Sequence, residues 1–107
     1  MSNVYKNAKL DLTTTNATVL LTVPAARTAI FKSILVSEDS GSADTITATV
    51  TDAAAAVFSL FKVKAVAANT TIELLTAPLV LETGEILKFN AATANRLHVV
   101  ASYLEVS

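Results

Sequence analysis

Hydrophobic and polar residues alternate along much of this 107-residue chain, with a period of two residues. The clearest example is the segment 45–51, in which Ile46, Ala48 and Val50 are separated by threonines. Successive side chains of a β-strand point to opposite faces, so this pattern predicts a strand with its apolar set inward and its threonines outward. No convincing amphipathic helix is found, and the sequence therefore predicts an all-β protein.

The C-terminal segment 97–106 is a long predicted strand that is rich in β-branched and aromatic residues and free of glycine and proline. Its apolar residues fall on both alternating sets, namely Leu97, Val99, Ala101 and Tyr103 on one, and Val100, Leu104 and Val106 on the other. A strand that is apolar on both faces is usually covered on both faces. We therefore predict that this strand is central to a sheet or buried beneath a partner.

Shorter predicted strands precede it at intervals of roughly 8–12 residues, the spacing typical of sandwiches and barrels. Pro24 and Pro78 end two of them, because proline has no N–H for a strand ladder. In the apolar segment 28–37, we expect Ile30, Ile34 and Val36 to share the face opposite Phe31 and Leu35. The pattern predicts one domain over residues 1–107, an antiparallel β-sandwich of about eight short strands with a jelly-roll or immunoglobulin-like layout. Residues 1–9 are predicted to form either an edge strand or an extended N-terminal arm.

The composition of the chain narrows the range of functions that we expect for it. Charged residues make up 16% of the chain, below the roughly 25% of an average soluble domain, which fits a surface that neighbouring subunits cover. The net charge is −1 and the basic residues are scattered except for Lys62 and Lys64, so no nucleic-acid-binding surface is predicted. No apolar run reaches membrane length and the N-terminus lacks a signal-peptide core, so we expect no membrane contact and synthesis in a cytoplasm.

Candidate catalytic and metal-binding groups are sparse. His98 is the single histidine, cysteine is absent, and no G-x-S-x-G motif is present, so the sequence predicts no enzyme, no cofactor and no metal centre. The acidic segment with Glu38, Asp39, Ser40 and Asp44 fits a solvated hairpin loop better than a weak cation site. Lys62 and Lys64 near two phenylalanines fit a solvated or interface face better than a stacking site for nucleotides.

The apolar residues on both sides of segments 57–66 and 97–106 need an explanation, because the outward faces of a two-layer sandwich are usually polar. Extra coverage by loops, a closed barrel and a subunit contact all provide one, and the low charge content favours a contact within a homo-oligomer. The candidate interface residues are Val4, Tyr5, Phe58, Leu60, Phe61, Lys62, Val100, Tyr103 and Leu104.

Three pairs of stretches carry a family resemblance: YKNA (5–8) with LDLT (10–13), TVPA (22–25) with TAIFKSI (28–34), and LETGEILK (81–88) with LHVVASYLE (97–105). On these stretches the chain resembles small virion structural proteins of tailed bacteriophages, particularly those of marine and cyanobacterial hosts. The resemblance implies a β-sandwich subunit located in the virion, with the major capsid protein or other virion proteins as partners.

The resemblance does not fix a position on the particle. The first expectation is a capsid decoration (cement) protein that binds and stabilises the shell. A neck, tail or fibre-attachment component is the structural alternative. A carbohydrate-binding module of a fibre ranks third, because sugar sites need exposed aromatic rings and most aromatic residues here occupy apolar strand positions.

Overall fold

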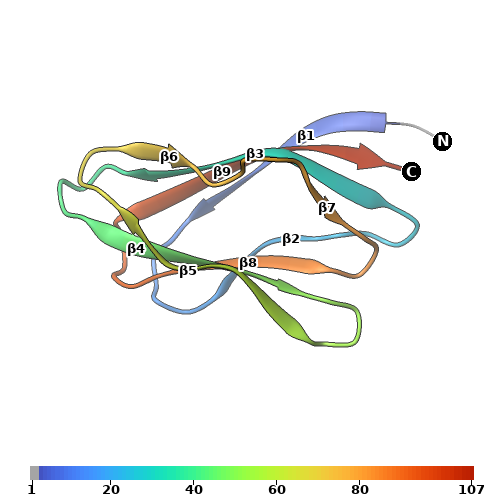
Figure 1. Ribbon diagram of the computed structural model, residues 1–107, viewed down its shortest axis with the longest axis horizontal. Helices are drawn as coiled ribbons and strands as arrows, with labels where there is room; N and C mark the ends of the chain where they lie inside the picture. The colour runs from blue at the N-terminus through green and yellow to red at the C-terminus, as the bar shows by residue number, and fades with distance from the viewer. Residues whose placement is uncertain (1–2) are drawn as a thin grey trace.

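The computed structural model describes residues 3–107, in which nine β-strands and no helix are found (Figure 1). The strands are β1 (Asn3–Asp11), β2 (Thr18–Thr22), β3 (Thr28–Glu38), β4 (Asp44–Thr51), β5 (Val57–Val66), β6 (Thr71–Glu73), β7 (Leu79–Leu81), β8 (Ile86–Ala91) and β9 (Leu97–Val106). All pairings between them are antiparallel.

The strands form two sheets that pack face to face, the upper and lower layers of Figure 1. The five-stranded sheet has the order β1-β9-β3-β6, with β7 also paired to β3, and the four-stranded sheet has the order β2-β8-β4-β5. The predicted antiparallel β-sandwich is confirmed.

The strand pairs are nested along the chain: β1 pairs with β9, β2 with β8, β3 with both β6 and β7, and β4 with β5. Because β6 and β7 both pair with β3, they are two parts of one strand that is interrupted at residues 74–78, where Pro78 lacks an N–H. Counted in this way, residues 3–107 form eight strands in the two-sheet order of a jelly roll, which differs from the immunoglobulin order.

Alternating residues of both sheets fill the core. Ile46, Ala48 and Val50 of β4 are buried, as the alternation predicts. β9 lies between β1 and β3, so its predicted central position is also confirmed. The inward set of β9 includes Tyr103, which is 5% exposed and packs against Phe31 with 5.0 Å between ring centroids. Tyr103, a candidate interface residue of the sequence analysis, is therefore placed in the core and leaves little surface for a contact.

The predicted faces of β3 are wrong at its start. The register with β9 shifts between Phe31 and Ser33, so Lys32 is the extra residue of a β-bulge. A bulge reverses the alternation on one strand. As a result Phe31 is buried together with Ile34, whereas Ile30 lies on the outer face.

The N-terminal segment is an edge strand within the described residues. β1 pairs with β9 without interruption from Asn3 opposite Val106 to Asp11 opposite His98. Residues 3–9 therefore do not form a free arm, and the remaining residues of that predicted arm, 1–2, lie outside the described part of the chain.

Candidate functional site

A row of apolar side chains crosses the outer face of the five-stranded sheet. Tyr5 lies opposite Leu104, Leu104 opposite Ile30, and Ile30 opposite Val80, so the row runs from β1 through β9 and β3 to β7. Tyr5 is 75% exposed and Val80 54% exposed, whereas Leu104 and Ile30 are half-buried. We call these four residues the outer row. The solvent faces of sandwiches are usually polar, so the outer row is a candidate contact surface.

A second, shorter apolar pair lies on the same face. Val100 and Leu35 are cross-strand neighbours and both are exposed, with Lys9 beside Val100 and Glu73 beside Leu35. Between this pair and the outer row lies a polar row of Asn7, Ser102 and Ser33. The outer face thus carries two parallel apolar bands, together with the charged residues Lys9, Asp11 and Glu73.

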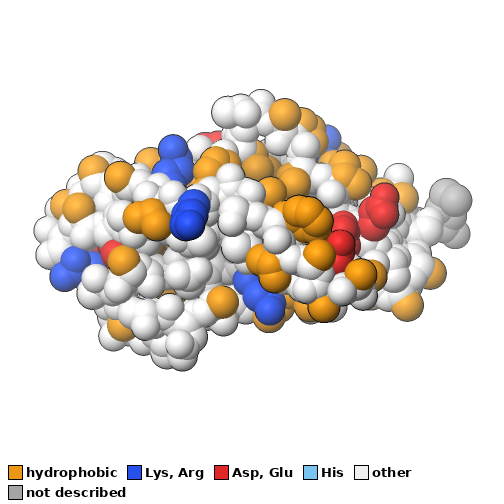
Figure 2. Space-filling model, turned by 60° about the horizontal axis from the view of Figure 1, so that its bottom comes forward, with side chains coloured by type: hydrophobic (Ala, Val, Ile, Leu, Met, Phe, Trp, Pro, Cys, Tyr) orange, Lys and Arg blue, Asp and Glu red, His pale blue; other side chains and the backbone are white. Residues whose placement is uncertain are grey.

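The remaining candidate residues lie on β5, at an edge of the other sheet. Phe58 is exposed at 56% and Lys62 is also exposed, whereas Leu60 and Phe61 are half-buried and pack against the core. Figure 2, which brings the bottom of Figure 1 forward, shows hydrophobic side chains in separate groups among basic, acidic and other polar atoms. The β5 residues therefore form a surface distinct from the outer row.

The structure divides the predicted interface residues accordingly. Tyr5, Val100 and Leu104 share the outer face of the five-stranded sheet, while Val4 is 44% exposed on the inward side of β1, opposite Glu105. Sequence reasoning missed Ile30, Leu35 and Val80. The alternation along β7 and β3 contained a signal for Val80 and Leu35. Ile30 was placed on the same face as Ile34 and Val36, because a bulge is not visible in a hydrophobic pattern.

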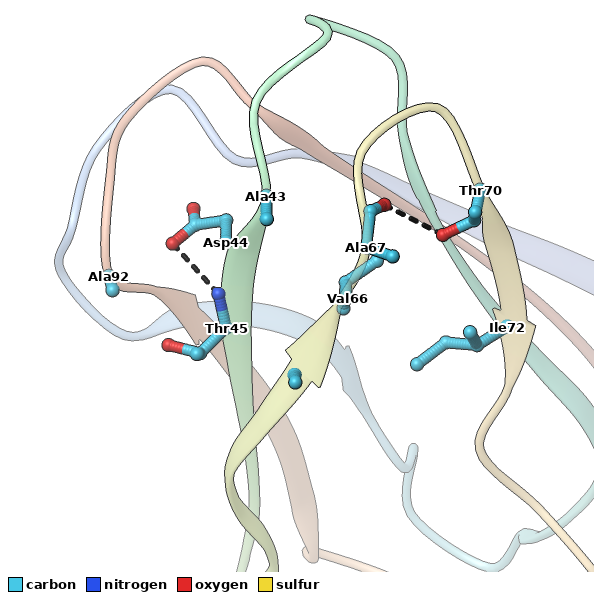
Figure 3. A pocket seen from close by; sticks show the side chains of 9 residues that line it. Ala43, Asp44, Thr45, Val66, Ala67, Thr70, Ile72 and Ala92 are labelled. Carbon is cyan, nitrogen blue, oxygen red and sulfur yellow. Dashed lines mark hydrogen bonds between the residues drawn. The ribbon is translucent and has the colours of Figure 1, made fainter.

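A cleft of about 750 Å³ opens where the ends of β4 and β5 approach β6 (Figure 3). Its walls are mostly methyl and methylene groups of the residues Ala43, Ala65, Val66, Ala67, Ile72 and Ala92, with Asp44, Thr45 and Thr70. Asp44 Oδ1 accepts a hydrogen bond from the Thr45 amide at 2.8 Å, and Oδ2 accepts one from the Thr93 amide at 3.1 Å. The cleft offers no free acid or nucleophile pair, and it has no aromatic ring on which a sugar could stack.

The acidic loop is held together by a buried carboxylate. Glu38 is 1% exposed and accepts hydrogen bonds from the amides of Ser40, Gly41 and Asn69 at 2.9–3.1 Å, and from the Ser40 hydroxyl. These bonds, that of the Ser40 hydroxyl foremost, lower the pKa of Glu38 to about 2. The expectation of a simply solvated loop is therefore wrong at Glu38, whose oxygens are used to join two loops.

His98 gains partners that are distant in sequence. Its Nε2 lies 3.2 Å from Asp11 Oδ1, and its Nδ1 lies 3.4 Å from Asp39 Oδ2. The two carboxylates face opposite nitrogens of the ring, so they do not converge on one metal position. Within residues 3–107, no group of three or more histidine, aspartate or glutamate side chains is arranged to hold a metal ion.

A third buried carboxylate, Glu105, joins two other segments. Its Oε1 accepts hydrogen bonds from Lys6 Nζ at 3.0 Å and from Arg27 Nη1 at 2.9 Å. The hydrogen bond from Lys6, followed by the charges of Lys6 and Arg27, lowers the pKa of Glu105. Like Glu38 and Asp44, this carboxylate connects segments that are distant in sequence.

No protein-family model matches this chain, and no curated protein sequence is significantly similar to it. In the part of the chain that the structure describes, no helix is long and apolar enough to cross a membrane.

Proposed function

We propose that this protein is a structural, non-catalytic subunit of tailed bacteriophage particles, a decoration protein that binds the capsid shell through the outer face of its five-stranded sheet. The observation that carries this proposal is the outer row, Tyr5–Leu104–Ile30–Val80, an apolar row that crosses the outer face of the five-stranded sheet. The resemblance of the sequence to small phage virion proteins supplies the identity of the partner.

The geometry of the outer row suits a protein partner. Its ends are three strand spacings apart, roughly 14 Å, which is the scale of the central part of a protein–protein interface. Tyr5 provides a large, rigid side chain of the type that is enriched among residues dominating binding energy. Each such contact can be weak, because many copies on a symmetric shell increase overall stabilisation through avidity.

The fold is compatible with this role without specifying it. Jelly rolls occur in viral capsid proteins and also in lectins, so the strand order alone does not separate a shell-binding subunit from a sugar-binding module. The chemistry of the cleft favours the former, because the nine residues that line it include no aromatic side chain.

The copy number per particle tests the proposal. Quantitative mass spectrometry of purified virions, with the major capsid protein as the internal standard, is expected to give near parity for a decoration protein. A value of about a dozen copies or fewer would contradict decoration and indicate a ring in the neck or tail instead. Absence from virions would overturn the virion assignment itself.

A matched pair of variants tests the proposed surface. Val80→Lys places a charge in the outer row, and Val19→Lys places the same charge on an exposed valine of β2, in the other sheet. We expect Val80→Lys to weaken binding to particles lacking the protein by about tenfold or more, and Val19→Lys to bind normally. Equal binding by the two variants would exclude the outer row as the contact.

A further inference from the structure

The outer edge of β1 is the most regular exposed strand edge among the described residues. Its nine residues pair with β9 without a register shift. The other edges are each interrupted: β2 has a shift after Val19, β5 has two shifts and a positive φ at Val63, and β6 and β7 have three residues each. Bulges and short strands protect an edge from pairing with another chain. β1 has neither of these protections, and its inward-pointing lysine, Lys6, is paired with Glu105 of the neighbouring strand β9.

From this edge we propose that two copies of the chain associate through β1, antiparallel across a two-fold axis at Asn7, joining their five-stranded sheets into one. The inference concerns a second copy of this protein and is independent of the partner proposed above. An isologous two-fold contact of this kind uses the same surface on both copies. Pairing over nine residues supplies roughly nine backbone hydrogen bonds, as many as a typical stable interface contains.

The side chains of β1 fit this register. Residues directly opposite one another in an antiparallel pair must point to the same face, and the register centred on Asn7 is the one that pairs all nine residues. Across the axis it places Asn3 opposite Asp11, Val4 opposite Leu10, Tyr5 opposite Lys9, Lys6 opposite Ala8, and Asn7 opposite Asn7.

This arrangement is complementary in polarity and charge. Val4, which is 44% exposed, meets the half-buried Leu10 on the inner face, and the exposed ring of Tyr5 meets the aliphatic stem and ammonium group of Lys9 on the outer face. No like charges are opposed. A register centred on Lys6 would instead set two lysines directly opposite each other, which is unfavourable.

The pairing also extends the candidate contact surface. The outer row of one copy, which ends at Tyr5, continues into Lys9, Val100 and Leu35 of the second copy. The polar row of Asn7, Ser102 and Ser33 lies at the centre of the combined face. Two apolar bands, one on each side of this polar centre, follow from the two-fold symmetry.

Charge substitution at the axis tests the pairing. Asn7 is exposed on the outer face, so Asn7→Lys and Asn7→Asp leave the core unchanged while each opposes two like charges across the axis. By sedimentation analysis over a wide concentration range, we expect the unmodified protein to dimerise and each variant to dimerise roughly tenfold more weakly. An equimolar mixture of the two variants is expected to recover association, as mixed dimers.

A cysteine at the same position gives a second readout, because the chain contains no cysteine. Asn7→Cys is expected to form a disulfide-linked dimer on mild oxidation, since residues opposed in this way have Cβ atoms roughly 4.5–5.5 Å apart. Ser102→Cys, one strand further from the edge on the same face, is the control and should not cross-link. The proposal would be overturned if the unmodified protein were monomeric, or if neither charge substitution at residue 7 weakened association. It would also be overturned if the two cysteine variants cross-linked equally.

Discussion

Glu38 accepts a hydrogen bond at 3.1 Å from the backbone amide of Asn69, a residue 31 positions later in the chain. Asn69 has a positive φ of 56°, and its amide, together with those of Ser40 and Gly41, faces the buried carboxylate. The β3–β4 loop and the β5–β6 loop are thereby fixed to each other next to the apolar cleft.

This carboxylate makes stability depend on pH. The pKa of Glu38 is lowered from 4.5 to about 2 in the folded state. The ionised carboxylate therefore contributes its full share to the free energy of unfolding at pH values above the unfolded-state pKa, and this contribution is lost as the pH falls from about 5 toward 2. We expect Glu38→Gln to lower the midpoint of urea unfolding at neutral pH and to weaken its acid dependence over that window. Glu82→Gln, which removes an exposed carboxylate, is the control. If the stability of Glu38→Gln fell with acid as steeply as that of the unmodified protein, Glu38 would not be the source of the pH dependence.

Phenylalanines of the core and of the surface should respond very differently to truncation. Phe89 is 0% exposed, so Phe89→Ala is expected to lower the free energy of unfolding by about 3–5 kcal/mol. Phe58 is 56% exposed, and Phe58→Ala should cost less than about 1 kcal/mol. Chemical denaturation of the two variants measures both values. Similar losses would show that Phe58 is covered, for example by a partner.

The β4–β5 turn contains strain that glycine should relieve. Ala55 has a φ of 67°, which an L-residue with a side chain adopts at a cost. We expect Ala55→Gly to raise the free energy of unfolding by about 0.5–1 kcal/mol. Ala54→Gly, at the neighbouring exposed position without a positive φ, should instead lower it by about 0.5–1 kcal/mol, because glycine gains more freedom on unfolding. Thermal unfolding of the two variants shows whether each one raises or lowers the free energy of unfolding.

Two lysines of β1 should differ in their effect on stability. Lys6 donates a hydrogen bond to the buried carboxylate of Glu105, whereas Lys9 points to the opposite, outer face. Lys6→Met leaves Glu105 with Arg27 as its remaining partner and is expected to lower the melting temperature, while Lys9→Met, measured at a concentration at which the protein is monomeric, should leave it nearly unchanged. Equal melting temperatures would mean that Arg27 alone satisfies Glu105.

The sequence determined the features that depend on local alternation. Ile46, Ala48 and Val50 face inward because a strand reverses its side chains at every residue, and β9 is central because both of its faces carry apolar residues. The sandwich and the approximate number of strands follow from the same pattern, repeated between turn and proline signals. The surface candidates Tyr5, Val100 and Leu104 were also found in this way.

Tertiary structure decided what depends on pairing between distant segments. The bulge at Lys32 moved Ile30 to the outer face and Phe31 into the core, because register is set by β9 and not by β3 itself. The jelly-roll order became visible only from the nested strand pairs. The buried position of Glu38 likewise depends on a hydrogen bond from an amide 31 residues later in the chain. The outer row exists only because four strands align one apolar residue each, and a pattern read along a single strand contains no information about its neighbours.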